Sequence, residues 1–151
     1  MSTLSYNSPV GPLTLFEDDG HIVAVEWGWP PDSTEPLSPL LERARDQLEA
    51  YFEGRLKEFD LPLAPTGTAF QMKVWQALSR IPFGTTRSYA ELAAELGTAP
   101  RALGGACGRN PLPILIPCHR VLGANRSLGG YSGMDGVETK RLLLKLEGAL
   151  E

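Results

Sequence analysis

Residues 88–110, SYAELAAELGTAPRALGGACGRN, decide how the second half of the chain folds. Ser88 followed by Glu91 is a capping box, which predicts the start of a helix, and Gly97 suits its end. A second helix can begin at Pro100, so two short helices lie on either side of a tight turn. This is the spacing of a helix-turn-helix, although many helical hairpins with the same spacing bind nothing.

The second helix of this pair has almost no large side chains, because small residues fill it: Ala99, Ala102, Gly104, Gly105, Ala106 and Gly108. Each interior glycine costs about 1 kcal/mol relative to alanine. Close approach of another surface to the backbone would explain that cost, and the surface is either another part of this protein or a DNA groove. If it is DNA, we expect contacts from Ala102, Gly105 and Arg109, while Arg101 reaches phosphates or the space left by a displaced base.

A further helix is predicted just before this pair. Thr68 and Gln71 form another capping box, and apolar residues continue at helical spacing as far as Ile81, before Pro82. The region that holds these helices, residues 66–151, has 10 Lys and Arg against 6 Asp and Glu. A basic balance of this kind favours a polyanionic partner, although it also fits charges that fall unevenly on solvated surfaces.

The first part of the chain has a different pattern. Apolar and polar residues alternate on both sides of Asp19-Gly20, which is a hairpin signal. Residues 40–52 then repeat apolar side chains at helical spacing, and LPLAPTGT, residues 61–68, is the expected linker. The predicted fold class is therefore α+β, with a small antiparallel sheet and one helix in a scaffold domain, 1–63, and a mostly helical domain, 64–151.

Composition bounds the class of protein. The 151 residues include 42% hydrophobic ones, which is ordinary for a folded domain, and no apolar run is long enough to span a membrane. The N-terminus, MSTLSYNSPVG, lacks the basic and apolar blocks of a signal peptide, so we expect a cytoplasmic protein. In that compartment Cys107 and Cys118 are expected as free thiols, and their spacing does not spell out a metal site.

Cys118 lies in an unusual stretch, RNPLPILIPCHRV, residues 109–121. Its prolines forbid a helix, so Ile114–Ile116 is predicted as a short buried strand or extended segment that holds the thiol at its end. Neighbouring residues of an extended chain point to opposite sides, and a water molecule is therefore the expected link between Cys118 and His119. A cysteine in an apolar run is most often an inert core residue, but the adjacent histidine and arginine favour a reactive one.

Several stretches together resemble the O6-alkylguanine-DNA alkyltransferases, the methylated-DNA–protein-cysteine methyltransferase family. They are GRNPLPILI before IPCHRV, RALGGACGRNP, FGTTRSYAELA, GGYSG and KRLLLKLE. The resemblance covers roughly residues 68–148 in strong motifs and the N-terminal half in outline. It implies repair of DNA by direct reversal, in which an alkyl group moves from guanine O6, and from thymine O4, to a cysteine that is consumed.

The resemblance also implies roles for single residues. Cys118 would be the alkyl acceptor, with His119 as its water-mediated base and Glu147 as the carboxylate that orients the histidine. Asn110 would brace the turn around the active site, and Tyr89 would donate a hydrogen bond to the leaving guanine.

The remaining implied roles concern DNA and the flipped base. Arg101 would fill the stack after the damaged nucleotide swings out, and the backbone carbonyl of Val121 would accept from the guanine amine. Tyr131 and Ser132 would close over the base, with Lys140 near the pocket mouth. The implied partner is double-stranded DNA, bound through its minor groove by a monomer. Cooperative binding is left open, and no cofactor and no metal are implied.

Two other classes of function share parts of this pattern. A cysteine hydrolase also needs a thiol, a histidine and an acid, but it predicts turnover. A helix-turn-helix regulator predicts sequence-specific affinity in the major groove and no requirement for Cys118.

Overall fold

The computed structural model describes residues 2–28, 38–128 and 136–150. The chain divides into two compact units, Met1–Thr66 and Gly67–Glu151. Within the described ranges, no helix combines the length and the apolar character that crossing a bilayer requires.

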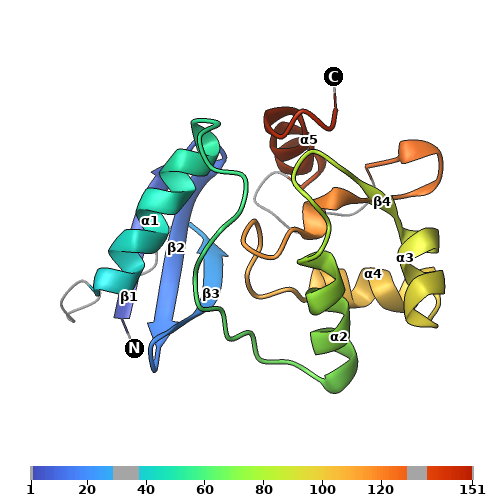
Figure 1. The fold of residues 1–151 in the computed structure, drawn as a ribbon, viewed down its shortest axis with the longest axis horizontal. Coiled ribbons are helices and arrows are strands. Elements are labelled where there is room, and N and C mark those ends of the chain that lie inside the picture. The colour runs from blue at the N-terminus through green and yellow to red at the C-terminus, as the bar shows by residue number, and fades with distance from the viewer. Residues whose placement is uncertain (1, 29–37, 129–135, 151) are drawn as a thin grey trace. The chain divides into compact units, whose positions relative to one another are not determined.

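The N-terminal unit is a three-stranded antiparallel sheet with one helix on it (Figure 1). Its strands are β1 (Ser2–Ser8), β2 (Gly11–Asp18) and β3 (His21–Trp27), in that spatial order. The predicted hairpin turn is confirmed, because Asp19 and Gly20 have φ values of 51° and 78°. Both values lie in the left-handed region that a tight hairpin turn of this type requires.

Helix α1 (Pro39–Phe52) begins at the predicted place because the side chain of Ser38 accepts hydrogen bonds from the backbone of Leu40 and Leu41. One face of the helix is buried, namely Leu41, Ala44, Leu48 and Tyr51. It packs against the sheet, whose Leu13 and Leu15 are fully buried. These apolar contacts form the core of the unit.

Part of the predicted linker belongs to the sheet instead. The backbone amide of Ile22 donates to Pro62 O at 2.8 Å, and that of Ala64 donates to Ile22 O at 3.0 Å. Leu63, within the predicted linker, thus forms a bridge with Ile22. An unpaired strand edge leaves backbone N–H and C=O groups without hydrogen bonds. Residues 62–64 cover part of the open edge of β3 by pairing with Ile22.

The C-terminal unit contains four α-helices among the described residues: α2 (Ala69–Leu78), α3 (Tyr89–Leu96), α4 (Pro100–Gly108) and α5 (Val137–Leu146). Both predicted capping boxes are present, at Thr68 and at Ser88. Helix α3 ends as expected at Gly97, whose φ of 68° is left-handed. The predicted helix-turn-helix is thus α3 followed by α4, and the α+β fold class is confirmed.

Helix α4 is held in place by α2. The indole of Trp75 donates to the backbone oxygen of Ala106 at 2.9 Å, in the interior of the unit. Trp75 also lies so close to Gly67 that a β-carbon there would come within 2.5 Å of its ring. A glycine is therefore required at position 67. The buried indole of Trp75 fixes the position of α4 through its hydrogen bond to Ala106.

The segment before Cys118 differs from the prediction. Residues Ile114–Ile116 are buried as expected, but they form a tight turn rather than an extended strand, with Ile116 N donating to Leu112 O at 2.8 Å. Ile114 has a φ of 74°, which is rare for a β-branched residue. Alternating prolines exclude a helix, but they do not exclude a compact turn whose shape is imposed by the surrounding core.

Candidate active site

The glycine-rich face of α4 is unobstructed. A β-carbon built on Gly104, Gly105 or Gly108 would find no atom within 4 Å among the described residues outside the local backbone. Close packing inside the unit therefore does not explain these glycines. Ala102, Gly105, Arg101 and Arg109 are all exposed, so this face can accept an external surface.

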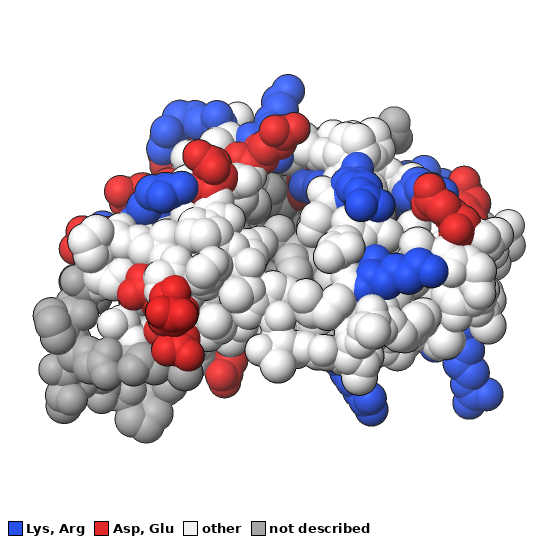
Figure 2. All heavy atoms as spheres, turned by 60° about the horizontal axis from the view of Figure 1, so that its bottom comes forward, with Lys and Arg blue, Asp and Glu red and all other residues white. Residues whose placement is uncertain are grey.

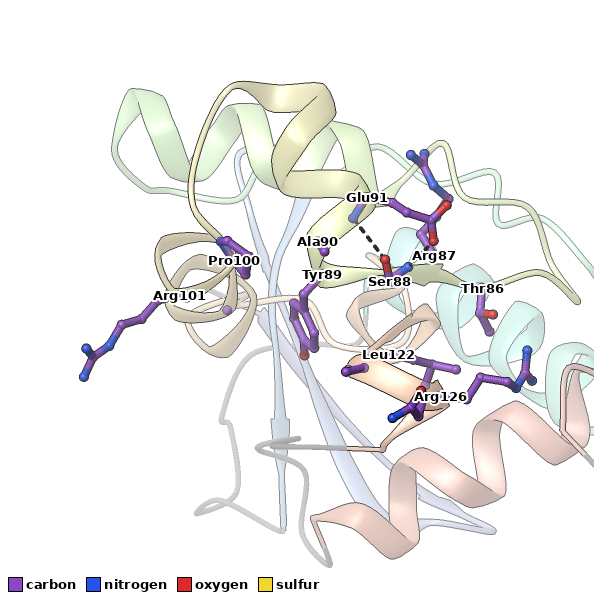
Figure 3. Close-up of a pocket in the computed structure, with 14 residues that line it drawn as sticks. Thr86, Arg87, Ser88, Tyr89, Ala90, Glu91, Pro100, Arg101, Leu122 and Arg126 are labelled. Atoms are coloured by element: carbon purple, nitrogen blue, oxygen red, sulfur yellow. Dashed lines mark hydrogen bonds between the residues drawn. The ribbon is translucent and has the colours of Figure 1, made fainter.

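The basic side chains are spread out rather than clustered. In Figure 2 several Lys and Arg side chains project singly from the surface, whereas others lie against Asp and Glu. Arg101 is directed away from α4 in Figure 3, and it lies beside a cavity of about 1040 Å³. The walls of the cavity come from β4 (Arg87–Ser88), α3, α4 and the turn η2 (Ala124–Arg126). Basic side chains that are spread out in this way suit contacts with successive phosphates of DNA better than they suit binding of a single anion.

Tyr89 links this cavity to the thiols. Its ring lines the cavity and points toward β5 (Val121–Leu122), as Figure 3 shows. Burial, together with the negative charges that Cys107 and Cys118 would carry as thiolates, raises the pKa of its hydroxyl to about 12. The hydroxyl is therefore a hydrogen-bond donor at neutral pH.

Cys118 begins a 3-10 turn, η1 (Cys118–Arg120), and is buried. Burial raises the pKa of its thiol, although a hydrogen bond from the Asn110 side chain and the charge of Lys140 act in the opposite direction. Asn110 also spans the preceding turn, since its Nδ2 donates to Ile116 O at 2.9 Å and its Oδ1 accepts from Leu112 N at 2.9 Å. The resting group is therefore a thiol, and reaction needs a base nearby.

His119 is fully buried and paired with Glu147, the residue at the C-terminal end of α5. Its Nε2 donates to Glu147 Oε2 at 2.7 Å. Burial lowers the pKa of the imidazole, against the opposing effect of Glu147. Its Nδ1 has no hydrogen-bond partner among the described residues, so a neutral His119 holds one bare, buried acceptor.

Arg120 is a site residue that the sequence reasoning did not assign. Its Nε donates to Glu147 Oε1 at 2.8 Å and its Nη2 to Glu147 Oε2 at 3.0 Å, while Nη1 donates to Ile81 O at 2.6 Å. The guanidinium also lies 5.8 Å from the centre of the Phe83 ring. The available signal was an arginine directly after the histidine in the apolar stretch PILIPCHRV, since an arginine that becomes buried there needs a carboxylate partner.

Lys140, which the resemblance places near the pocket mouth, is fully buried. Its Nζ donates to the backbone oxygen of Val121 at 2.7 Å and lies 5.6 Å from the centre of the Tyr89 ring. Burial lowers the pKa of the ammonium, while the potential thiolates of Cys118 and Cys107 favour its charge. The carbonyl of Val121 thus already accepts one hydrogen bond and retains a second lone pair.

The predicted residues therefore form two groups. The turn and its surroundings bring together Cys118, His119, Glu147, Asn110, Val121, Lys140 and Tyr89, whereas Arg101, Ala102, Gly105 and Arg109 lie on or at the end of α4. Tyr131 and Ser132 lie outside the described residues. In the described part of the chain, no group of three or more histidine, cysteine or acidic side chains could hold a metal ion.

Comparison with known proteins adds independent evidence. Residues 69–149 match the family model described as 6-O-methylguanine DNA methyltransferase, DNA binding domain. Residues 2–65 match that of the ribonuclease-like domain of the same methyltransferase. A methylated-DNA–protein-cysteine methyltransferase from Methanosarcina acetivorans is 46% identical, over 95% of this chain and 96% of the relative. The constitutive one from Bacillus subtilis is also 46% identical, over 93% and 91%.

A solved structure shows the same fold. The crystal structure of Mycobacterium tuberculosis OGT in complex with DNA is similar with a TM-score of 0.86 and 44% identity, covering 97% of this chain and 92% of that one. Fold, site and relatives together define a class of DNA-repair proteins that transfer an alkyl group from DNA to a cysteine of their own. This chain belongs to the 6-O-methylguanine DNA methyltransferase family, and its C-terminal unit carries the DNA-binding domain of that family.

Proposed function

We propose that this protein removes alkyl groups from guanine O6, and from thymine O4, in double-stranded DNA and transfers them irreversibly to Cys118. One observation carries the choice of residue. Cys118 is a buried thiol in the same turn as His119, and that histidine is paired with the buried Glu147. The second thiol, Cys107, is a poor rival, because it lies near the C-terminal end of α4, outside the turn that holds His119.

The chemistry follows from these groups. The Cys118 thiol gives its proton, through a water molecule, to the bare Nδ1 of His119, and Sγ then attacks the alkyl carbon. The bond from carbon to O6 breaks, its electron pair stays on the guanine, and the Tyr89 hydroxyl donates to the purine as this charge develops. The thiol proton finally replaces the alkyl group on the base, and a thioether remains on Cys118.

Irreversibility follows from the product. A thioether has no easily broken bond to sulfur, and nothing in the sequence suggests a way to remove the alkyl group. Each molecule should therefore react once.

Access to the lesion requires base flipping, because a duplex hides the alkyl carbon in its stack. We propose that α4 enters the minor groove with its glycine face, where a side-chain carbon added at Gly105 would hold the backbone away from the DNA. The exposed Arg101 would take the place of the extruded nucleotide and so offset part of the unstacking cost. The Val121 carbonyl would accept from the guanine amine on the lone pair that Lys140 leaves open.

Intact-mass measurement after incubation with duplex DNA that carries labelled O6-methylguanine tests this function. One added methyl group on Cys118 is expected. Cys118→Ala should abolish the transfer, and Cys107→Ala, the matched thiol control, should retain it. Release of label with turnover would support a cysteine hydrolase instead, and binding without transfer would support a regulator.

A second comparison tests the flipping role of Arg101. Arg101→Ala should slow transfer from duplex DNA more than transfer from free O6-methylguanine, and equal slowing would contradict the role. The proposal also includes action as a monomer in the cytoplasm, which sedimentation of the protein with and without DNA and localisation of the tagged chain would test.

A further inference from the structure

Among the described residues, three nitrogen atoms donate hydrogen bonds to the two carboxylate oxygens of Glu147. Its side chain has no exposed surface, and it accepts from His119 at 2.7 Å and from two nitrogens of Arg120 at 2.8 and 3.0 Å. Removing a carboxylate from water costs several kcal/mol unless a partner compensates its charge. A planar guanidinium that meets both oxygens is the geometry that compensates it best.

Arg120 is not free to leave this position. Its third nitrogen donates to the backbone oxygen of Ile81 at 2.6 Å, and its charge lies over the ring of Phe83. The side chain is 8% exposed. The segment after α2 therefore holds the arginine on the opposite side from Glu147, so that it acts as a fixed clamp on the carboxylate.

The charges around His119 determine its protonation state. Glu147 and Arg120 cancel, so a protonated imidazole would leave a net positive charge in a buried site that already has the ammonium of Lys140 nearby. The other titratable neighbour, Cys118, is a thiol at rest. Helix α2, which also packs against η1, buries only uncharged residues, Val74, Trp75, Ala77 and Leu78.

We propose that Arg120 is a positioning residue that neutralises Glu147 and thereby keeps His119 an uncharged ring, with its proton on Nε2 and a bare Nδ1 ready to receive the proton of Cys118. This inference rests on the proposed function for its purpose, but the state of the ring can be measured without any substrate. Without Arg120, the single charge of Glu147 would be compensated by a proton on His119. The imidazolium has no lone pair and cannot act as a base.

The test observes the histidine ring nitrogens by NMR in protein labelled with ¹⁵N-histidine. The chain has two histidines, so the exposed His21 supplies an internal reference. In the wild type, His119 should show the neutral ring with its proton on Nε2 throughout the range from pH 6 to 8. An imidazolium at neutral pH in the wild type would overturn the proposal without any variant.

Variants then isolate the charge of Arg120. In Arg120→Gln the titration midpoint of His119 should rise by about 1–3 pH units, the size expected when one neighbouring charge is removed. Arg120→Lys, which keeps the charge, should return the midpoint most of the way to that of the wild type. Arg141→Gln, a matched change at a partly exposed arginine of α5, should leave it unchanged.

Single-turnover kinetics separate positioning from a merely structural role. In Arg120→Gln the transfer rate should fall most below the new midpoint and recover as the pH rises through it. A loss of rate that is equal at every pH, or a folded Arg120→Gln in which His119 stays neutral, would overturn the proposal. Absence of transfer in the wild type would refute the proposed function instead, and it would leave the ring measurement intact.

Discussion

Gly105→Ala should make the protein more stable and less able to bind DNA. Gly105 lies inside α4, its φ is not in the left-handed region, and an added β-carbon would meet nothing within 4 Å among the described residues. Alanine should therefore gain close to its full helix propensity, about 1 kcal/mol in the free energy of unfolding. For a chain of this length that gain corresponds to a rise in Tm of roughly 2–4 °C.

The same methyl group would stand on the face that we assign to the DNA groove. A methyl forced into a packed interface costs roughly 1–3 kcal/mol, so affinity for duplex DNA should fall about 5- to 150-fold. Transfer from free O6-methylguanine should be unaffected, because a β-carbon at the exposed Gly105 would contact no described residue, whereas Cys118 is buried. Thermal unfolding by circular dichroism and anisotropy of a labelled duplex measure the two effects.

Gly97→Ala is the control, because it should change the free energy of unfolding in the opposite direction. Gly97 has a φ of 68°, so alanine there is strained and should lower the free energy of unfolding by about 1 kcal/mol. If Gly105→Ala destabilised the protein, or if it bound duplex DNA as tightly as the wild type, the assignment of the open face of α4 to DNA would be refuted.

Three further predictions concern the buried network and Tyr89. Glu147→Gln leaves the guanidinium of Arg120 uncompensated and should lower the free energy of unfolding in urea by about 3–5 kcal/mol. The same change at the exposed Glu95 should cost no more than about 1 kcal/mol, and similar losses at both sites would contradict the burial argument. Because burial lowers the pKa of His119 in the folded protein, the imidazole becomes protonated at a higher pH in the unfolded chain than in the folded one. Stability should therefore decline by up to about 1.4 kcal/mol per pH unit below roughly pH 6.5, with a smaller slope in His119→Gln. Tyr89→Phe keeps the ring but removes the donor, so single-turnover transfer from duplex DNA should slow roughly 100-fold; an unchanged rate would exclude the hydroxyl from the reaction.

Local signals in the sequence predicted the helices well. The capping boxes at Thr68 and Ser88 and the terminator Gly97 each act within a few residues, and the structure has all three. Such signals depend on hydrogen bonds between neighbours in the chain, so no knowledge of the fold is needed to read them. The hairpin at Asp19-Gly20 was predictable for the same reason.

Features that depend on distant partners could not be predicted in this way. Leu63 lies in a stretch with linker composition, and only the open edge of β3 gives it a place in the sheet. Lys140 is a long charged residue on an amphipathic helix, which normally faces solvent, and its burial depends on a carbonyl that lies far away in sequence. The clamp of Arg120 likewise joins Glu147 to Ile81, and no spacing rule connects these three residues.

The resemblance to a known family supplied what local patterns could not, since it named the cysteine, the histidine and the glutamate together. The structure places His119 and Glu147 in contact.

The left-handed backbone conformation of Ile114 affects how readily the turn before Cys118 opens. A branched residue in that conformation stores roughly 1–3 kcal/mol, which is released when the turn opens. Transient opening should therefore begin here, and the amide protons of Ile116 and Cys118, although bonded within the turn, should exchange with solvent sooner than those at the centre of α4. The sulfur of Cys118 would then follow a turn that opens more readily than the centre of α4.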